Sequence, residues 1–270
     1  MCNRIKSRVM LTILLVCLMF VFVLPVSAAA EESTLDKVIS RGKVIVGIGM
    51  ATPPFGYFDD KGNPAGFDPD YAQELAKSLN VKLEIVPLEG MNRIPYLLSK
   101  KVDLVIATFS ITLERAQTIA FTTPYTVDQL VLLSRVGSGI KGLKDLAGKR
   151  VAVPKGTVQD TIITEKAPKG TIIDRYSADA EAILAVQQGK ADATSTNVYG
   201  AQLIVQKDPK LTIGDTISVD YMSFGVRRGD IEWLNYLNWF LTIINTNGTS
   251  DAIYKRWWGV EEMPKLLPNY

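Results

Sequence analysis

The sequence predicts an α/β protein built from two lobes in tandem. Apolar strands alternate with amphipathic helices in the order β-α-β-α-β, and the same alternation starts again after residue 139. Two extended segments, 125–133 and 217–226, fit connections between the lobes. Such alternation is typical of a mostly parallel sheet flanked by helices. Two connections between two sheets would leave a cleft with a hinge behind it.

The first lobe is defined by short apolar runs and by helix-start signals. We expect strands at 43–48, 81–86 and 102–107, and helices over 68–79 and 92–98. Asp68-Pro69 predicts the start of the first helix, because Asp is a good N-cap and Pro is favoured at the first helical position.

The second lobe repeats this pattern with shorter strands. We expect strands at 150–154, 171–173 and 191–197, and helices over 179–188 and 198–206. Two C-terminal amphipathic helices, 231–245 and 251–258, are expected to pack outside. The tryptophans in this part of the chain are expected to pack rather than to bind, namely Trp233, Trp239, Trp257 and Trp258.

The turn after the 102–107 strand is the strongest candidate site. Thr112 can cap the helix that follows, and the turn carries two more hydroxyls, free amides and the guanidinium of Arg115. Arginine binds a carboxylate through two parallel hydrogen bonds, and the carboxyl ends of strands are where α/β sheets bind ligands. The alternative is that Arg115 is an exposed helix arginine paired with an acid. A second glycine-containing turn, 155–160, is a further potential anion site.

The N-terminus has the pattern of a cleaved secretory signal peptide. A basic segment, an apolar run over 9–23 and small residues up to Ala30 occur in that order, so we expect cleavage near Ala30 and a periplasmic protein. The alternative is a retained membrane anchor, for which the apolar run is short. Cys2 and Cys17 both lie in this segment, and neither follows the small residue that lipoprotein attachment needs.

Composition excludes several function classes. Without residues 1–30 the chain carries 27 basic and 28 acidic residues, a net charge of −1, and no basic block that suggests a nucleic-acid or membrane-surface partner. The chain has no histidine, and the mature part has no cysteine. A Ser-His-Asp triad, a thiolate nucleophile and zinc held by His or Cys are therefore excluded, and we expect no metal and no cofactor.

Seven short motifs, in order, resemble the polar amino-acid-type solute-binding proteins of ABC importers, that is, the bacterial extracellular solute-binding proteins of family 3. They are Pro53-Pro54-Phe55, Gly66–Asp70, Asn92–Pro95, Ser110–Arg115, Phe121–Tyr125, Gly189–Ala193 and Tyr254–Gly259. The resemblance implies a two-lobed periplasmic binding protein fold of type II, with mixed, mostly parallel sheets and a hinged cleft. It implies a signal peptide at 1–30, a first lobe of 31–126 and 221–270, and a second lobe of 127–220.

The same resemblance implies the binding site. Arg115 would hold the α-carboxylate of an amino acid, helped by the amide of Ser110 and by the amides of Thr157 and Val158 in the second lobe. Thr108 would accept a hydrogen bond from the ammonium group. The resemblance also implies that Phe55, which belongs to the motif Pro53-Pro54-Phe55, is a ligand-binding residue.

The chain also departs from the family at informative positions. Asn197 stands where many members have an aspartate for the ammonium group, Gly49 stands where some have another aspartate, and Thr52 and Gly90 replace the usual stacking aromatics. Arg93 resembles an arginine of acidic-amino-acid binders, although it could equally brace the start of its own helix.

These departures predict an anionic ligand, because two arginines, Arg93 and Arg115, would face a cleft without a carboxylate. The alternative is that an acid taken here as structural, Asp59, Glu89 or Asp128, points into the cleft, in which case arginine or lysine could bind tightly.

Three functions follow as hypotheses. The first is a monomeric periplasmic receptor that binds an amino acid or related small organic acid and docks on an ABC permease in the inner membrane. The alternative is an enzyme on the same fold that resembles the cyclohexadienyl dehydratases, for which we see neither a histidine nor an acid aligned to the pocket centre. A sensor domain of a larger receptor is disfavoured, because the chain ends without a transmembrane helix.

Overall fold

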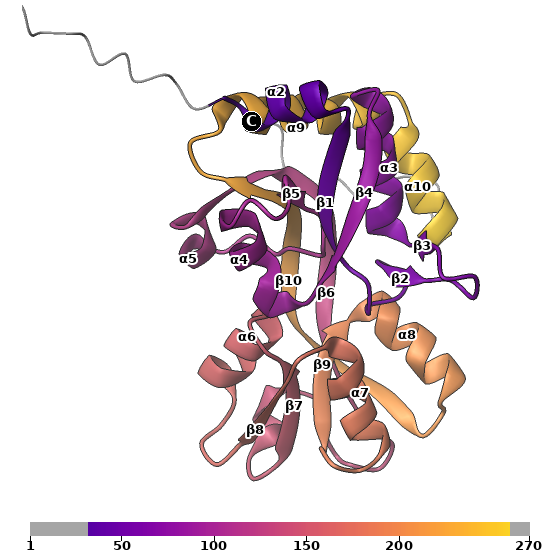
Figure 1. Cartoon of the computed structure of the whole chain (residues 1–270). Coiled ribbons are helices and arrows are strands. Elements are labelled where there is room, and N and C mark those ends of the chain that lie inside the picture. Colours follow the sequence, from indigo (N-terminus) through magenta and orange to yellow (C-terminus); the bar gives the residue numbers. More distant parts are fainter. Residues whose placement is uncertain (1–31, 260–270) are drawn as a thin grey trace, which may run out of the picture. The chain divides into compact units, whose positions relative to one another are not determined.

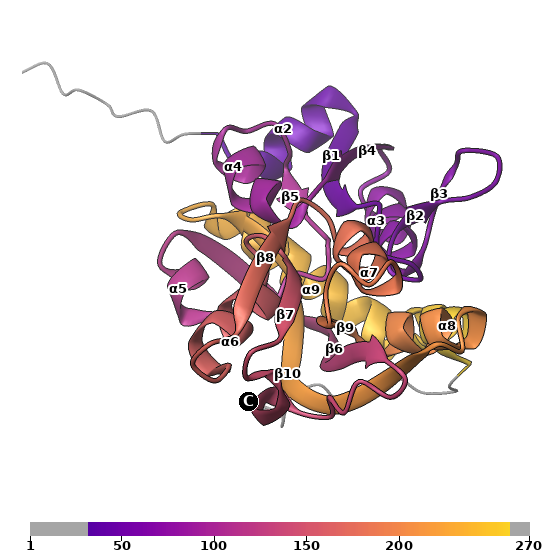
Figure 2. The same ribbon diagram turned by 90° about the horizontal axis from the view of Figure 1, so that it is seen from below.

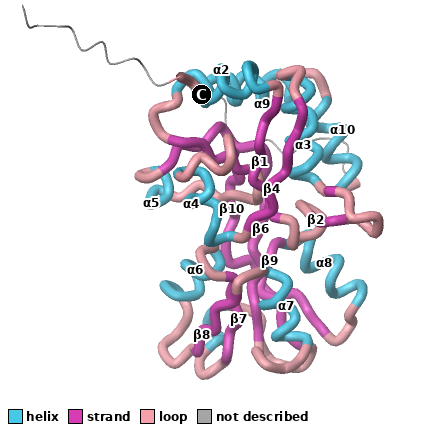
Figure 3. Tube along the Cα trace, viewed as in Figure 1, coloured by secondary structure: helices cyan, strands magenta, loops and turns pink. Residues whose placement is uncertain are grey.

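The computed structural model describes residues 32–259, and its strands join into one eight-stranded mixed sheet and a small hairpin (Figures 1 and 3). The sheet has the order β4-β1-β5-β10-β6-β9-β7-β8. Its strands are β1 (Lys43–Gly49), β4 (Lys82–Leu88), β5 (Leu104–Val105), β6 (Ile119–Arg135), β7 (Arg150–Pro154), β8 (Ile172–Tyr176), β9 (Ala193–Asn197) and β10 (Leu211–Arg227). The hairpin pairs β2 (Tyr57–Phe58) with β3 (Pro64–Ala65).

Helices cover this sheet, which confirms the α/β class. They are α2 (Thr34–Arg41), α3 (Phe67–Ser78), α4 (Arg93–Leu98), α5 (Leu113–Ala116), α6 (Val158–Lys166), α7 (Asp179–Gln187), α8 (Val198–Lys207), α9 (Ile231–Thr246) and α10 (Thr249–Trp258), with 3-10 turns at Gly90–Asn92 and Leu143–Leu146. Figure 2 shows α6 and α7 on either side of β7 and β8, as expected where parallel strands are joined by helices.

The two expected connections are longer than predicted and form strands. β6 and β10 pair in antiparallel over their length, from Ile119 opposite Arg227 to Arg135 opposite Leu211, with several register shifts. Near one end β10 also pairs with β5, and near the other β6 pairs with β9. The β6–β10 ribbon therefore joins a β1-β4-β5 half to a β7-β8-β9 half.

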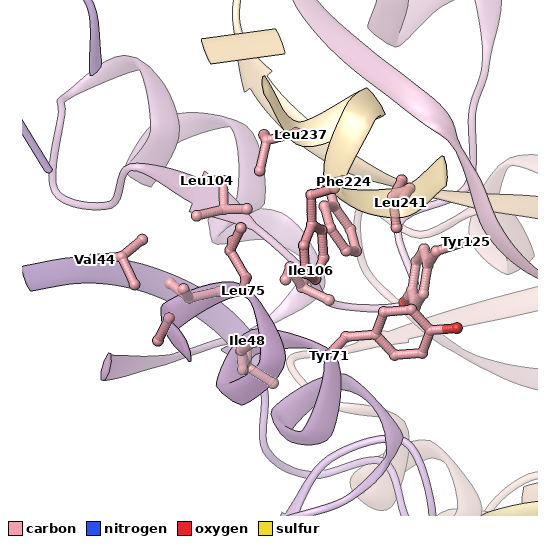
Figure 4. Packing of buried hydrophobic residues seen from close by; sticks show 14 of the residues in the cluster. Val44, Ile48, Tyr71, Leu75, Leu104, Ile106, Tyr125, Phe224, Leu237 and Leu241 are labelled. Atoms are coloured by element: carbon pink, nitrogen blue, oxygen red, sulfur yellow. The ribbon is translucent and has the colours of Figure 1, made fainter. Parts of the chain in front are cut away.

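Each half has its own hydrophobic core. In the first half, side chains from β1, α3 and α9 such as Val44, Tyr71 and Leu237 pack with Phe224 of the ribbon (Figure 4). In the second half, a separate cluster that includes Ala185 of α7 packs against β6 and β7. Each half has one further cluster, around Leu97 in the first and around Ile163 in the second. This division of the buried residues agrees with two lobes, and the lobe boundaries themselves stay a prediction.

Several local predictions are wrong or incomplete. The helix expected from Asp68 begins at Phe67, and Asp68 is a buried residue of its first turn instead of the N-cap. The 102–107 strand is reduced to β5, and the sequence argument missed α2 and the β2–β3 hairpin. Trp233 is fully buried as expected, but Trp239 is 67% exposed.

The N-terminal segment is treated separately. The expected signal peptide at 1–30 and its cleavage near Ala30 lie outside the described residues, as does the chain after Gly259. Within residues 32–259, no helix is both long and apolar enough to cross a bilayer.

Candidate functional site

A small cavity brings together the ends of strands and helices from both halves. It is lined by Thr52, Arg93, Thr108, Ser110, Asp128, Leu130, Thr157, Val158, Gln159, Asp179, Asn197 and Met222. Six of the eight predicted site residues are in this set: Arg93, Thr108, Ser110, Thr157, Val158 and Asn197. The turns that the sequence analysis selected therefore meet at one place.

Thr108 is held in a left-handed conformation by a buried carboxylate. Its φ is 44°, and its amide donates a hydrogen bond of 3.1 Å to Asp68 Oδ2. The Tyr125 hydroxyl donates to Asp68 Oδ1 at 2.6 Å. Burial raises the pKa of Asp68 to about 7, although both hydrogen bonds favour the ionised form. Asp68 thus fixes the shape of the turn and is not itself part of the cavity wall.

Arg115 lies beside the cavity and spans two turns. Thr112 caps α5 as predicted, accepting a hydrogen bond of 3.1 Å from the Arg115 amide. The Arg115 guanidinium donates from Nη1 to the Ser110 carbonyl at 2.8 Å and from Nη2 to the Gly156 carbonyl at 3.1 Å. Burial, and repulsion from Arg93, lower the pKa of Arg115 to about 10, so the group stays charged at neutral pH.

Arg93 is a second cation, and it faces the cavity directly. It is the first residue of α4, it is 8% exposed, and its Nε is buried without a hydrogen-bond partner. Its guanidinium carbon lies 5.5 Å from the centre of the Phe109 ring, and that of Arg115 lies 5.1 Å from the same ring. Burial lowers the pKa of Arg93, and Asp179 opposes this shift most strongly.

The second half contributes the N-terminus of α6. Thr157 is its N-cap, accepting a hydrogen bond of 3.3 Å from the Asp160 amide and donating one of 2.7 Å to the Pro154 carbonyl. Val158 and Gln159 follow in the first turn and line the cavity. Amides in a first helical turn have no partner within the helix, so they are free to bind an anion.

Asn197 is in the cavity wall, and its side-chain oxygen caps a helix. It is the N-cap of α8, and its Oδ1 accepts a hydrogen bond of 2.6 Å from the Gly200 amide. The side-chain NH2 group donates, and Oδ1 keeps one further lone pair. Asn197 therefore offers a ligand only a neutral acceptor, where a carboxylate would offer a charged one.

Two carboxylates of the cavity, Asp128 and Asp179, were not among the predicted site residues, although Asp128 was one of the three acids named as alternatives. Asp128 is 2% exposed; its Oδ1 accepts from the Gln129 amide at 2.7 Å, and its Oδ2 has no hydrogen-bond partner. Burial raises the pKa of Asp128 to about 7. The missed signal was strand alternation, because Asp128 and Leu130 share one face of β6.

Asp179 begins α7, where a carboxylate is stabilised by the helix dipole. Burial raises its pKa and the charge of Arg93 lowers it, so these two cavity groups stabilise each other. The expectation of an anionic ligand counted the two arginines and neither acid. With Asp128 and Asp179 in the wall, that argument from charge no longer holds.

Phe55 does not reach the cavity. It is 1% exposed and packs in the core of the first half, with ring centres 5.9 Å from Phe67 and 5.1 Å from Trp258. Phe55 therefore holds the Pro53-Pro54 loop against the core, and the prediction that it contacts a ligand is corrected.

A second hollow adjoins the cavity between α7 and α8. The two share Thr52, Asp179 and Asn197, and the hollow continues along Ile183 and Leu203. Among the described residues, no cluster of three or more His, Cys, Asp or Glu could hold a metal ion.

Comparison with known proteins gives one family match. The family model described as bacterial extracellular solute-binding proteins, family 3, matches residues 44–260. The chain is 30% identical over 240 residues to the L-cystine-binding protein TcyJ of Escherichia coli strain K12, covering 87% of this chain and 90% of that protein. It is 29% identical over 239 residues to the glutamine-binding protein GlnH of Bacillus subtilis strain 168, covering 86% of each.

Solved structures agree. The P235GK mutant of ArgBP from T. maritima matches with a TM-score of 0.79 and 34% identity, over 84% of this chain and all of that one. The ancestral amino acid-binding protein AncCDT-1, a precursor of cyclohexadienyl dehydratase, matches with a TM-score of 0.78 and 34% identity over the same shares. A solute receptor for L-cysteine of Neisseria gonorrhoeae matches with a TM-score of 0.80 and 28% identity, over 84% of this chain and 94% of that one. The two-lobed type II fold is confirmed by these neighbours.

Proposed function

The chain belongs to family 3 of the bacterial extracellular solute-binding proteins, the polar amino-acid-type receptors of ABC importers, and on that premise we propose that it binds a small α-amino acid between its two halves and delivers it to an ABC permease. The observation that carries this proposal is the meeting of two strand-to-helix turns at one cavity. Ser110 comes from the first half, and Thr157 and Val158 come from the second.

The ligand carboxylate would lie between Arg115 and the first turn of α6. The Arg115 guanidinium already joins the turn at Ser110 to the turn at Gly156 through two carbonyl oxygens. A carboxylate at the N-terminus of α6 can accept hydrogen bonds from the amides of Val158 and Gln159. The same carboxylate can form an ion pair with the Arg115 guanidinium. Binding would then require both halves, which couples ligand capture to closure.

The class of side chain is inferred from the charges of the wall. Arg93 and Asp179 carry opposite charges, and each stabilises the charged form of the other. The wall therefore has no clear excess of positive or negative charge around a zwitterionic ligand. A ligand with a neutral or polar side chain fits this balance better than a dicarboxylate. The relatives named for cystine, glutamine, arginine and glutamate/aspartate span neutral, cationic and anionic ligands, so the proposal rests on the charges of the wall.

A thermal-shift screen of the purified mature protein tests this function. A ligand that binds only the folded state raises the melting temperature by mass action. We expect at least one L-α-amino acid to raise it by several degrees, and dicarboxylates without an amino group to raise it less. A flat response to all twenty amino acids and to L-cystine would contradict the proposal.

A dehydratase remains the second candidate, for one specific reason. The wall carries a buried acid, Asp128, whose pKa of about 7 suits proton donation, and one structural neighbour is described as a precursor of cyclohexadienyl dehydratase. The named homologues are nevertheless binding proteins. Incubation with prephenate or arogenate separates the two, because turnover would support the enzyme and its absence the receptor.

A further inference from the structure

The buried carboxylates of the described residues differ in one respect. Asp68 and Asp220 accept hydrogen bonds on both oxygens, and Asp103 pairs with Arg41. Asp128 alone in this set keeps a buried oxygen, Oδ2, that accepts no hydrogen bond, and this residue lines the cavity. A buried acceptor without a donor is costly in a folded protein, so its persistence calls for an explanation.

We propose that Asp128 accepts the α-ammonium group of the bound amino acid and thereby selects ligands that carry one. This inference rests on the proposed receptor function. An ammonium offers three donors and no acceptor, and a charge-assisted hydrogen bond to a carboxylate is among the strongest available to it. Binding would satisfy Oδ2 at the moment when the closed cleft excludes water.

The position of Asp128 in the sheet supports this role. Leu130 of β6 lies opposite Asn197 of β9, and Asp128 is two residues along the same strand, on the same face. The oxygen of Asn197 is neutral and already accepts a hydrogen bond from the Gly200 amide, so it offers an ammonium group a weaker partner than a carboxylate does. The carboxylate that Asn197 lacks is thus supplied from the neighbouring strand.

The surroundings of Asp128 disfavour its negative charge, which a bound cation would stabilise. Asp220 lies opposite it on β10, and the resulting repulsion disfavours its charge. The amides of Gln129 and Val198 favour the charge but do not remove the cost of burial. Tyr199 and Tyr254, the other titratable groups that sense it, are phenols whose pKa values are themselves raised, so they are neutral at physiological pH.

The test uses pairs of ligands that differ only in the α-ammonium group. L-glutamine is compared with glutaramic acid, L-arginine with 5-guanidinopentanoic acid, L-glutamate with glutaric acid, and L-cystine with 3,3′-dithiodipropionic acid, each by calorimetry on the mature protein. For the pair that binds, we expect the wild type to prefer the amino acid at least tenfold. In Asp128→Asn this preference should fall to about threefold or less, while the des-amino partner keeps its affinity.

Two further variants make the result specific. Glu165→Gln removes an exposed carboxylate near the end of α6 and should leave the preference unchanged. Asn197→Asp in the Asp128→Asn background returns a carboxylate to the same wall and should restore part of the preference.

Two outcomes would overturn the inference. One is an undiminished preference in Asp128→Asn; the other, which needs no variant and so covers a failure to fold, is a wild type that binds the des-amino partner as tightly as the amino acid. If none of the four amino acids binds, the receptor function itself fails, which is a different result from binding that ignores Asp128.

Discussion

Arg115 Nη2 donates a hydrogen bond to the carbonyl oxygen of Gly156 at 3.1 Å, and so joins the turn before α5 to the turn before α6. Nη1 of the same side chain holds the Ser110 carbonyl at 2.8 Å. A guanidinium has five N–H donors in a fixed plane, so these two bonds leave others for a ligand. The rigid guanidinium of Arg115 can therefore bind a ligand carboxylate and, at the same time, hold the two turns together when the halves close.

We expect Arg115→Ala to weaken amino-acid binding by about 2–5 kcal/mol, roughly 30-fold or more, because truncating one partner of a buried charge pair leaves the other uncompensated. Arg115→Lys should also bind weakly, since a point charge cannot hold two turns and a carboxylate together. Calorimetry measures both affinities, and circular dichroism checks that the variants remain folded. Wild-type affinity in Arg115→Lys would contradict the assignment of Arg115 to the carboxylate site.

Closure should be blocked by a methyl group at Gly90. A Cβ there would lie 2.8 Å from Thr157 Cγ2 and 3.3 Å from the Lys155 carbonyl oxygen, both on the other half. Gly90→Ala should therefore lower affinity and reduce the compaction on ligand addition seen by small-angle scattering. Gly49→Ala is the matched control, because its Cβ would meet only ordinary contacts at 3.9 Å. Equal behaviour of the two variants would show that the halves do not close against each other here.

Amino-acid affinity should rise with pH up to neutrality. Burial and Asp220 raise the pKa of free Asp128 to about 7, and an ammonium partner would lower it, so the bound state holds fewer protons. Affinity is then weakest below the bound-state pKa and levels off above pH 7; we expect roughly a tenfold gain from pH 5.5 to 7.5. Asp128→Asn should flatten this dependence, and a slope that survives the substitution would point to another group, such as Asp179.

Asp68 should matter for stability more than for contact with the ligand. Asp68→Ala would leave the Tyr125 hydroxyl and the Thr108 amide without their acceptor. An unsatisfied buried group typically costs about 1–3 kcal/mol, and we expect a loss of unfolding free energy in that range, measured by urea denaturation. The exposed Asp60→Asn is the control. Stability unchanged from wild type would show that water replaces the carboxylate in the turn.

Asp68 should also shape the pH dependence of folding. Its folded-state pKa of about 7 is above the ordinary aspartate value of 3.8, so the folded protein holds the proton more tightly than the unfolded chain. The group's contribution to the free energy of unfolding is thus largest at low pH and declines as pH rises through this window. Asp128 acts in the same direction in the unliganded protein.

Local patterns predicted the elements that frame the site. The strand at 43–48, the helix at 179–188 and the cap at Thr112 are all present within a residue or two. Each of these depends on its own neighbours in the sequence, through apolar alternation or a hydroxyl three residues ahead of an amide. The same kind of local signal predicted the strand-to-helix turns at 108–115 and 155–160, which the tertiary fold brings together at one cavity.

What the sequence could not predict depends on tertiary contacts. Asp128 lies in a segment that resembled a connection, and only its pairing with Asn197's strand and with β10 turns it toward the cavity. Asp68 has the local signature of an N-cap, but its oxygens are taken by Tyr125 and Thr108, which are distant in the chain. Phe55 belongs to a family motif, and its burial against Trp258 follows from the packing of α10.

The most direct test of this account is a crystal structure of the mature protein with the amino acid that raises its melting temperature most. We predict a carboxylate within about 3.2 Å of Arg115 and of the first-turn amides of α6, and an ammonium nitrogen at the same distance from Asp128 Oδ2. A ligand bound instead in the hollow between α7 and α8, or with its ammonium turned away from Asp128, would contradict it.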